Sequence, residues 1–201
     1  MYPHNGYFFT FDVMKLLLTL TLLLSLSTRT IEERKMVWYY NSGGIKTETL
    51  FTDEWLVKSF KQFNEDGTVL LEVEYDSVFS KYNYLDKTDP AWEFNKRIGT
   101  MPVGQVSGNT LYRGQQCVVH YICFSNTGQQ FDNSFQKNMP LEFVVGSPNL
   151  LTSFSRGLTK FKPGQYGFLY IPSYLGYGDV QMGNVPPNSD LYYFIQVLPQ
   201  K

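Results

Sequence analysis

The chain has 201 residues, which is enough for one ordinary domain and a short additional module but not for two large domains. Its formal net charge is −1 at pH 7, and this balance argues against a broad nucleic-acid-binding surface, because such surfaces carry a clear basic excess. Aromatic residues make up 17% of the chain, which favours a β-rich globular protein over a disordered one.

An apolar segment, LLLTLTLLLSL at residues 16–26, lies near the start of the chain. A helix needs about 20 apolar residues to span a bilayer, so this segment is too short to do so. Lys15 precedes the segment and Ser27 follows it, as in a secretory signal. We predict a signal peptide over residues 1–27 and export to the periplasm or cell envelope. The alternative is an uncleaved anchor, in which case the protein contacts a membrane.

Two similar stretches, WYYNSGGIKTETLF and KQFNEDGTVLLEVEY, follow within residues 36–75. Aligning Asn41 with Asn64 also aligns Gly44 with Gly67, which gives a period of 23 residues. Each unit has an aromatic residue, an Asn-x-x-Gly turn and a β-rich run, which predicts a hairpin turn followed by a strand. The pair resembles two MORN-type repeats of the form found in small exported bacterial proteins. A single β-meander is the alternative.

Residues 76–110 have mixed polarity and no sustained period, and Asp89 with Pro90 forms a turn signal. We predict a linker here, with one short helix around residues 90–97. The predicted parts of the chain are a signal peptide or anchor at 1–27, a β-rich repeat segment at 28–80, a linker at 81–108 and the main domain at 109–201.

From Tyr112 onward, turn signals recur every 8–12 residues with predicted strands between them, the pattern of an antiparallel sheet. One helix interrupts the strands. Ser147 and Pro148 form a start signal and Gly157 a stop signal, although the start can also lie a turn later, near Leu151. A short amphipathic helix on one curved antiparallel sheet is an α+β fold. The predicted strands are 115–124, 141–145, 165–172 and 190–198.

The predicted strand at 115–124 carries both cysteines, Cys117 and Cys123. Along a strand they lie roughly 20 Å apart, whereas a disulfide needs Cα atoms within about 7 Å, so we expect two unpaired core residues. His120 alternates with Tyr121 and is therefore expected to face away from the side that Tyr121 occupies. No ligand spacing in the chain supports a metal site, and no cofactor is expected.

An ordered set of short motifs runs through the second half of the chain. The set comprises Arg113-Gly114, Val118-Val119-His120-Tyr121, Gly128, Phe131-Asp132-Asn133-Ser134, Pro140, Gly146, Gly157-Leu158, Pro163-Gly164, Ile171-Pro172, Tyr177-Gly178, Pro186-Pro187-Asn188 and Leu191. In this order and at these spacings it resembles the FKBP-type peptidyl-prolyl cis-trans isomerase family over residues 109–198. The resemblance implies a half-barrel antiparallel sheet wrapped around one short helix. It also implies proline-containing polypeptide segments as substrates and macrolides as inhibitors.

The resemblance further implies roles for ten residues. The residues with catalytic roles are Tyr121, Asp132, Leu151 and Tyr177, and those with substrate-binding roles are Phe131, Leu141, Leu150, Phe154, Val185 and Tyr193. Asp132 is expected at the pocket edge, hydrogen-bonded to the Tyr121 hydroxyl. The Leu151 N–H and the Tyr177 hydroxyl are expected to bind substrate carbonyls, and Phe154 is expected to form the pocket floor.

Rotation about an X–Pro bond breaks no covalent bond, but it must cross a barrier of about 18–20 kcal/mol. Twisting reduces the charge separation of the amide, so a dry aromatic pocket should favour the twisted state. Without the motifs, Phe131 and Phe154 could equally be plain core residues, and Asp132 could make a local turn. A chain lacking residues 28–108 is expected to remain active.

Several positions depart from the usual pattern of the family. Phe154 replaces a usual Trp, Leu141 a common aromatic residue, and Lys137 an Arg that often braces the acid. These changes leave a second function open, a chaperone or peptide-binding module with little isomerase activity.

Overall fold

The computed structural model describes residues 34–199, so the predicted signal segment lies outside the described residues. These residues form two antiparallel sheets, and among them no helix is long and apolar enough to cross a membrane. The first sheet has the order β1-β2-β3-β4, with β1 at Arg34–Tyr39, β2 at Ile45–Phe51, β3 at Val57–Phe63 and β4 at Val69–Glu74. The second sheet has the order β5-β6-β10-β11-β7-β8, and β9 at Leu141–Val144 also pairs with β7. The other strands of this sheet are β5 at Glu93–Asn95, β6 at Ile98–Val103, β7 at Gln116–Phe124, β8 at Gln130–Asn133, β10 at Tyr166–Ile171 and β11 at Leu191–Val197. The helices are α2 at Asp76–Lys81, α3 at Ser134–Lys137, α4 at Thr152–Leu158 and the 3₁₀-helix η1 at Ser173–Leu175.

The first sheet is a meander built from one kind of hairpin turn. In each turn, the N–H of the first residue donates to the carbonyl of the residue four positions on, and the carbonyl of the first residue accepts from the N–H of the residue three positions on. The turns begin at Tyr40, Thr52 and Asn64. Equivalent positions in alternate turns are therefore 24 residues apart, and the predicted period of 23 was wrong by one. The left-handed glycine that corresponds to Gly67 is Gly43, not Gly44.

The second sheet confirms the four strands predicted for the main domain, with ends that differ by at most one residue. The turn signals in the sequence explain this success, because each of these strands lies between turns that contain Gly or Pro. β8 was not predicted. It has four residues and pairs with the end of β7, where Cys123 lies opposite Asp132.

The segment predicted as a linker contributes two strands to this sheet. β6 pairs along its length with β10, and the helix predicted around residues 90–97 was wrong because β5 occupies that region. Pro102 was a misleading turn signal. It is tolerated in β6 because β5 extends only as far as the partner of Thr100, which leaves the position beside Pro102 unpaired on that side.

The helix α4 begins at Thr152, with Leu151 at its N-cap, so the later of the two predicted starts is correct. Gly157 was predicted as the stop, but it lies inside the helix, which ends at Leu158. The reason for a glycine is close packing, because a Cβ there would lie 2.3 Å from Leu169 Cδ1. Gly157 thus lets α4 lie close against β10.

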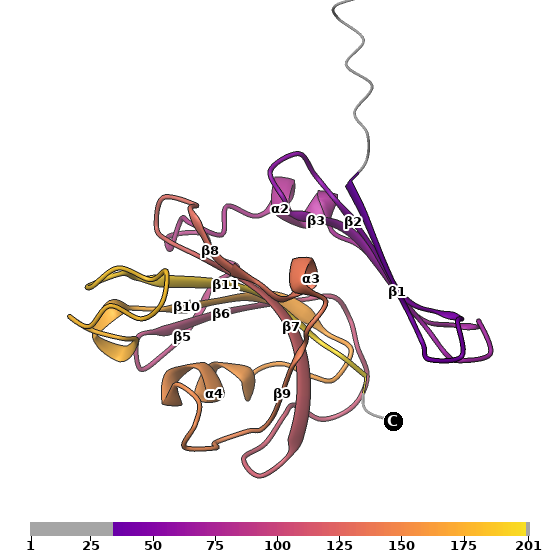
Figure 1. The fold of residues 1–201 in the computed structure, drawn as a ribbon. Coiled ribbons are helices and arrows are strands. Elements are labelled where there is room, and N and C mark those ends of the chain that lie inside the picture. The colour runs from indigo at the N-terminus through magenta and orange to yellow at the C-terminus, as the bar shows by residue number, and fades with distance from the viewer. Residues whose placement is uncertain (1–33, 200–201) are drawn as a thin grey trace, which may run out of the picture. The chain divides into compact units, whose positions relative to one another are not determined.

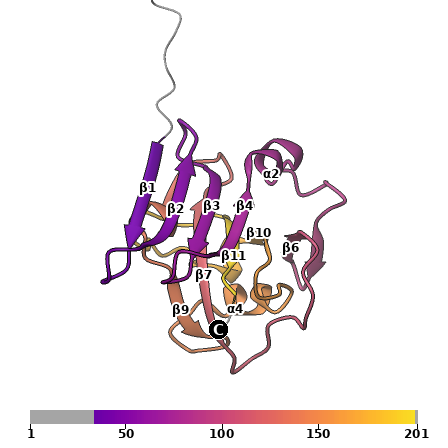
Figure 2. The same cartoon turned by 90° about the vertical axis from the view of Figure 1, so that its right-hand side faces the viewer.

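Two hydrophobic clusters cover the opposite faces of the second sheet. Alternate residues of β11 belong to different clusters: Tyr193 and Ile195 face α4, whereas Tyr192 and Phe194 face the first sheet. Figure 1 shows α4 on one side of the strands and β1–β3 on the other, and Figure 2 shows the first sheet lying across β7 and β11. The inner face of the half-barrel is therefore covered by α4, and its outer face is covered by the first sheet.

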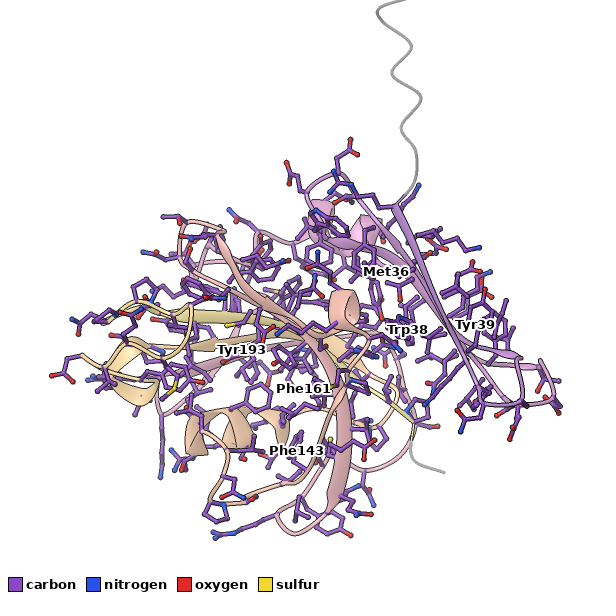
Figure 3. All side chains as sticks on the ribbon, viewed as in Figure 1. Met36, Trp38, Tyr39, Phe143, Phe161 and Tyr193 are labelled. Carbon is purple, nitrogen blue, oxygen red and sulfur yellow. The ribbon has the colours of Figure 1, made fainter. Side chains whose placement is uncertain are left out.

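Figure 3 labels aromatic residues that lie beside the second sheet and others that lie on β1. Phe161 and Tyr193 are buried on the α4 side of the second sheet, and Phe143 packs against the same cluster. Trp38 and Tyr39, on the edge strand β1, are exposed. The aromatic residues thus serve mainly to fill the two hydrophobic clusters, one on each face of the second sheet.

Candidate active site

A cavity of about 620 Å³ opens between the ends of β7 and β8, strand β9, the start of α4 and the loop after η1. All ten residues predicted as site residues line it. These are Tyr121, Phe131, Asp132, Leu141, Leu150, Leu151, Phe154, Tyr177, Val185 and Tyr193. Residues from six separate stretches of the chain therefore meet at one place.

Asp132 lies on β8 at the edge of this cavity and accepts three hydrogen bonds. The Tyr121 hydroxyl donates to Asp132 Oδ2 at 2.8 Å, which confirms the predicted bond. The Asn133 N–H donates to Asp132 Oδ1 at 2.7 Å, and the Lys137 ammonium forms an ion pair with the same oxygen. Lys137 thus occupies the bracing position beside the acid.

These partners set the charge of the site. Burial alone would raise the pKa of Asp132, but the bonds from Lys137, Tyr121 and the Asn133 N–H outweigh it and lower the pKa below its usual value. Burial and the bond to Asp132 raise the pKa of Tyr121. At neutral pH the pair is therefore a carboxylate and a protonated hydroxyl that donates to it.

Aromatic rings form the floor and walls of the cavity. Phe154, Tyr193 and Phe131 are each buried. The rings of Phe154 and Tyr193 lie 5.0 Å apart between centroids in an edge-to-face arrangement, and the ring of Tyr121 lies 6.1 Å from that of Tyr193. The interior of the cavity is therefore of low polarity, with the polar groups placed at its rim.

Further polar groups of the cavity come from the start of α4 and from the loop after η1. Leu151 is the N-cap of α4, and the N–H groups at the start of a helix have no partner within it. The Ser153 hydroxyl donates to the Leu175 carbonyl at 2.7 Å, which fixes the loop that carries Tyr177 to α4. Burial raises the pKa of Tyr177, so its hydroxyl stays protonated.

Six lining residues were not predicted as site residues. They are Cys123, Lys137, Asn149, Met182, Gly183 and Asn184. The alternation of β7 places Cys123 on the same face as Tyr121, and this signal could have identified it. Burial raises the pKa of Cys123 to about 12, so it is a neutral thiol in the cavity wall. The three residues from Met182 have no such periodic signal, because they lie in a loop.

His120 takes no part in this cavity, as its alternation with Tyr121 predicted. It is buried on the other face of β7, where its ring stacks on Phe135 at 4.5 Å and meets Phe60 at 5.4 Å between centroids. Burial lowers the pKa of His120 to about 3. Both cysteines are free and buried, as predicted.

Within residues 34–199, no three His, Cys, Asp or Glu side chains lie close enough together to hold a metal ion. A second cavity, of about 740 Å³, lies between the first sheet and β9, with Tyr40, Gln62 and Glu142 in its lining. It contains none of the ten predicted residues.

Comparison with known proteins connects this geometry to a family. Residues 108–198 match the family model described as FKBP-type peptidyl-prolyl cis-trans isomerase. Over 87 residues the chain is 30% identical to the peptidyl-prolyl cis-trans isomerase FKBP1A of Xenopus laevis. The aligned residues make up 43% of this chain and 81% of that protein.

Two solved structures are similar in fold. The N-terminal domain of FKBP42 from Arabidopsis thaliana is 23% identical with a TM-score of 0.52, over 57% of this chain and 94% of that one. FkpA from Escherichia coli is 25% identical with a TM-score of 0.52, over 61% of this chain and 58% of that one. Both agree with a curved antiparallel sheet around one short helix.

Proposed function

This chain belongs to the FKBP-type peptidyl-prolyl cis-trans isomerase family and is a peptidyl-prolyl cis-trans isomerase, and we propose that it acts on X–Pro bonds in the aromatic cavity beside Asp132. The observation that carries the proposal is the meeting of an apolar floor with polar groups at the rim of one cavity. The substrate is a proline-containing polypeptide segment, and the product is the same segment with the other isomer of the bond.

The low polarity of the aromatic part of the cavity lowers the barrier to rotation about the X–Pro bond. Phe154 lies under the proline ring, and Phe131 and Tyr193 form the walls on either side. The planar amide has separated charge that water stabilises, and the twisted amide has less. Moving the bond out of water therefore disfavours the planar state more than the twisted one, which is the difference that accelerates rotation.

The polar part holds the chain on both sides of the rotating bond. The Leu151 N–H binds one substrate carbonyl and the Tyr177 hydroxyl binds a second. The Asp132 carboxylate, held by Tyr121, polarises the amide from the side. A substrate anchored in this way needs only the rotation itself to reach the transition state.

Macrolides are proposed as inhibitors that fill the same cavity. Phe154 and Leu141 offer less aromatic surface than the Trp and aromatic residue usual at those positions, so we expect weaker macrolide binding than in typical members of the family. Titration of the protein with a macrolide, followed by tyrosine and tryptophan fluorescence, measures this affinity.

The test is catalysis of cis-to-trans isomerisation in a short X–Pro peptide by residues 28–201. Uncatalysed exchange takes tens to hundreds of seconds, so acceleration is easy to measure. Asp132→Val and Phe154→Ala should each lower kcat/KM by about tenfold or more, whereas Phe94→Ala, at a half-exposed ring outside the cavity, should not.

Full activity in both cavity variants would contradict the mechanism. Binding of the peptide by the folded wild type without acceleration, for several residues before proline, would instead favour a peptide-binding module or chaperone.

We also propose that the protein is exported and assists folding in the periplasm or cell envelope. The support is the apolar run at residues 16–26, flanked by Lys15 and Ser27. Expression of the full chain in a bacterium, followed by fractionation and mass determination, tests this. A periplasmic protein that begins near residue 28 is expected, and a full-length protein in the cytoplasm would refute the proposal.

For the first sheet we keep the proposal of two MORN-type repeats at residues 36–75. The support is the recurrence of one hairpin turn at Tyr40, Thr52 and Asn64, so that each repeat would consist of two hairpin-linked strands.

A further inference from the structure

The segment from Asp132 to Asn138 has two sides that face different parts of the molecule. The Asp132 carboxyl lines the aromatic cavity, whereas Asn133 and Phe135 are buried at 2% and 1% exposure toward the first sheet. Asn133 also caps α3, because its side chain accepts a hydrogen bond from the Gln136 N–H at 3.1 Å. The first sheet therefore lies behind the short segment that carries the acid and its ion-pair partner.

Two hydrogen bonds tie this segment to the first sheet. Asn133 Nδ2 donates to the Trp55 carbonyl at 3.2 Å, and the Thr47 hydroxyl donates to Asn138 Oδ1 at 3.2 Å. Thr47 lies on β2, and Trp55 lies in the turn between β2 and β3. The sheet thus holds the segment at both ends, with α3 between the two bonds.

An aromatic cluster also connects the first sheet to Tyr121, which donates a hydrogen bond to Asp132. Phe60 of β3 is fully buried and meets the rings of Phe135 at 5.6 Å and His120 at 5.4 Å, each edge-to-face. His120 Nδ1 lies 3.1 Å from Ser134 Oγ, and that hydroxyl oxygen accepts from the Tyr121 N–H at 2.7 Å. Phe60 therefore supports α3 directly, through Phe135. It also supports the backbone of Tyr121 indirectly, through the His120 ring and the Ser134 hydroxyl.

We propose that the first sheet positions the acid of the active site, with Phe60 and Thr47 as positioning residues that hold Asp132 at hydrogen-bonding distance from Tyr121 and Lys137. This inference rests on the role of Asp132 in the proposed function. The titratable groups around the carboxyl are Tyr121, Cys123, Lys137 and Tyr177. Loosening the segment would lengthen the bonds from Tyr121 and Lys137, both of which stabilise the carboxylate.

The test uses single variants of the full chain: two sheet variants, their two controls and Asp132→Asn. Two measurements are made, the pKa of the Asp132 carboxyl by carbon-13 NMR titration and kcat and KM for an X–Pro peptide. Phe60→Leu and Thr47→Val weaken the contacts with the segment. Phe168→Leu is the matched control for the ring, because Phe168 is buried in the same cluster but contacts the rings of α2 and β11. Thr49→Val is the control for the hydroxyl, because Thr49 is buried on the same face of β2.

We expect both sheet variants to raise the pKa of Asp132 toward its ordinary value of 3.8 and to lower kcat about three- to tenfold with little change in KM. The controls should lower the melting temperature without moving the carboxyl pKa. An unchanged pKa and kcat in Phe60→Leu and Thr47→Val, despite a lower melting temperature, would overturn the inference. If Asp132→Asn retains full activity, the proposed role of the acid is wrong, and the titration alone decides whether the sheet positions that carboxyl.

Discussion

At the scale of single residues, Asp132 shows how three donors offset the cost of partial burial. Because its pKa is lower in the folded chain than the ordinary 3.8, these bonds stabilise the fold at neutral pH. That contribution is lost as the pH falls below 3.8 and through the lower folded pKa. Acid therefore removes the charge of the site and part of the stability that holds the site together.

The bond from Tyr121 can be removed without changing the ring. In Tyr121→Phe, one of the donors to Asp132 is lost, so the pKa of that carboxyl should rise toward 3.8. We expect kcat/KM to fall by about five- to tenfold, as for the loss of one hydrogen bond to a partly exposed charged group. Titration of the carboxyl by NMR together with peptide kinetics measures both effects, and a pKa equal to that of the wild type would contradict this assignment.

His120 should make the protein sensitive to acid at a higher pH than Asp132 does. The unfolded chain has the ordinary histidine pKa of 6.5, whereas burial lowers it to about 3 in the folded chain. Between these values the unfolded state binds a proton that the folded state does not, so the free energy of unfolding falls as the pH is lowered.

We expect this residue to cost about 3 kcal/mol of stability between pH 7 and pH 4. Urea unfolding of the wild type and of His120→Gln at both pH values gives the difference. The variant should lose about that much less than the wild type on acidification, and an equal loss in the two proteins would show that His120 is not the titrating group.

At the scale of elements, β6 depends on a close approach to β10. A Cβ at Gly167 would lie 2.2 Å from the Met101 carbonyl oxygen and 2.9 Å from Pro102 Cα, and these are backbone atoms that cannot move without separating the strands. Gly167→Ala should therefore destabilise the protein by about 3 kcal/mol or more.

Gly44→Ala is the matched control for this change. A Cβ at Gly44 would meet only the Glu65 carbonyl at 3.6 Å, which is ordinary contact. Chemical unfolding of the two variants measures the difference, and a loss at Gly167 as small as that at Gly44 would contradict the close pairing of β6 with β10.

The elements that the sequence predicted well are those bounded by unambiguous turns. β7, β9, β10 and β11 each alternate between two buried faces or end at Gly and Pro, and these signals are local. β6 was missed because Gly99 and Pro102 are themselves turn signals. Gly99 is accepted in the strand because the Phe94 ring of β5 packs close against it, and Pro102 because β5 does not extend beside it. The turn glycine was misplaced by one because Gly43 and Gly44 are adjacent, and backbone hydrogen bonding selects which of them is left-handed.

The lining of the cavity was more predictable than the elements around it. The ten residues were found through the order and spacing of motifs rather than through any periodic pattern, and all ten line the cavity. The contacts behind the site could not be found in this way. Phe60 and Phe135 lie 75 residues apart, and no local pattern joins a strand of the first sheet to a short helix after β8.

At the scale of the whole molecule, the first sheet and the half-barrel share one hydrophobic cluster. Residues 28–108 supply Phe60 and Tyr75, which contact Phe135 and Phe194, and strand β6, which pairs with β10. The sequence predicts that a chain without residues 28–108 remains active, but the structure leads us to expect the opposite. Its β10 would lose the pairing with β6, and one face of its sheet would be exposed to water.

We therefore expect residues 109–201 alone to be insoluble or unfolded. Circular dichroism and the yield of soluble protein, compared with those of residues 28–201, give the measurement. A soluble fragment with a cooperative melting transition would show that the half-barrel folds without the first sheet.

The position of β11 has a consequence for synthesis. Within residues 34–199 it is the last strand, yet it lies between β10 and β7, and Gln196 accepts a hydrogen bond from the Tyr75 hydroxyl 121 residues earlier. Contacts between such distant parts of a chain form slowly and late. A nascent chain interrupted before Leu191 has no central strand to join its earlier pieces, so its aromatic faces remain open to aggregation and to proteases. The fold can thus be completed only after β11 has been synthesised and has paired with β10 and β7.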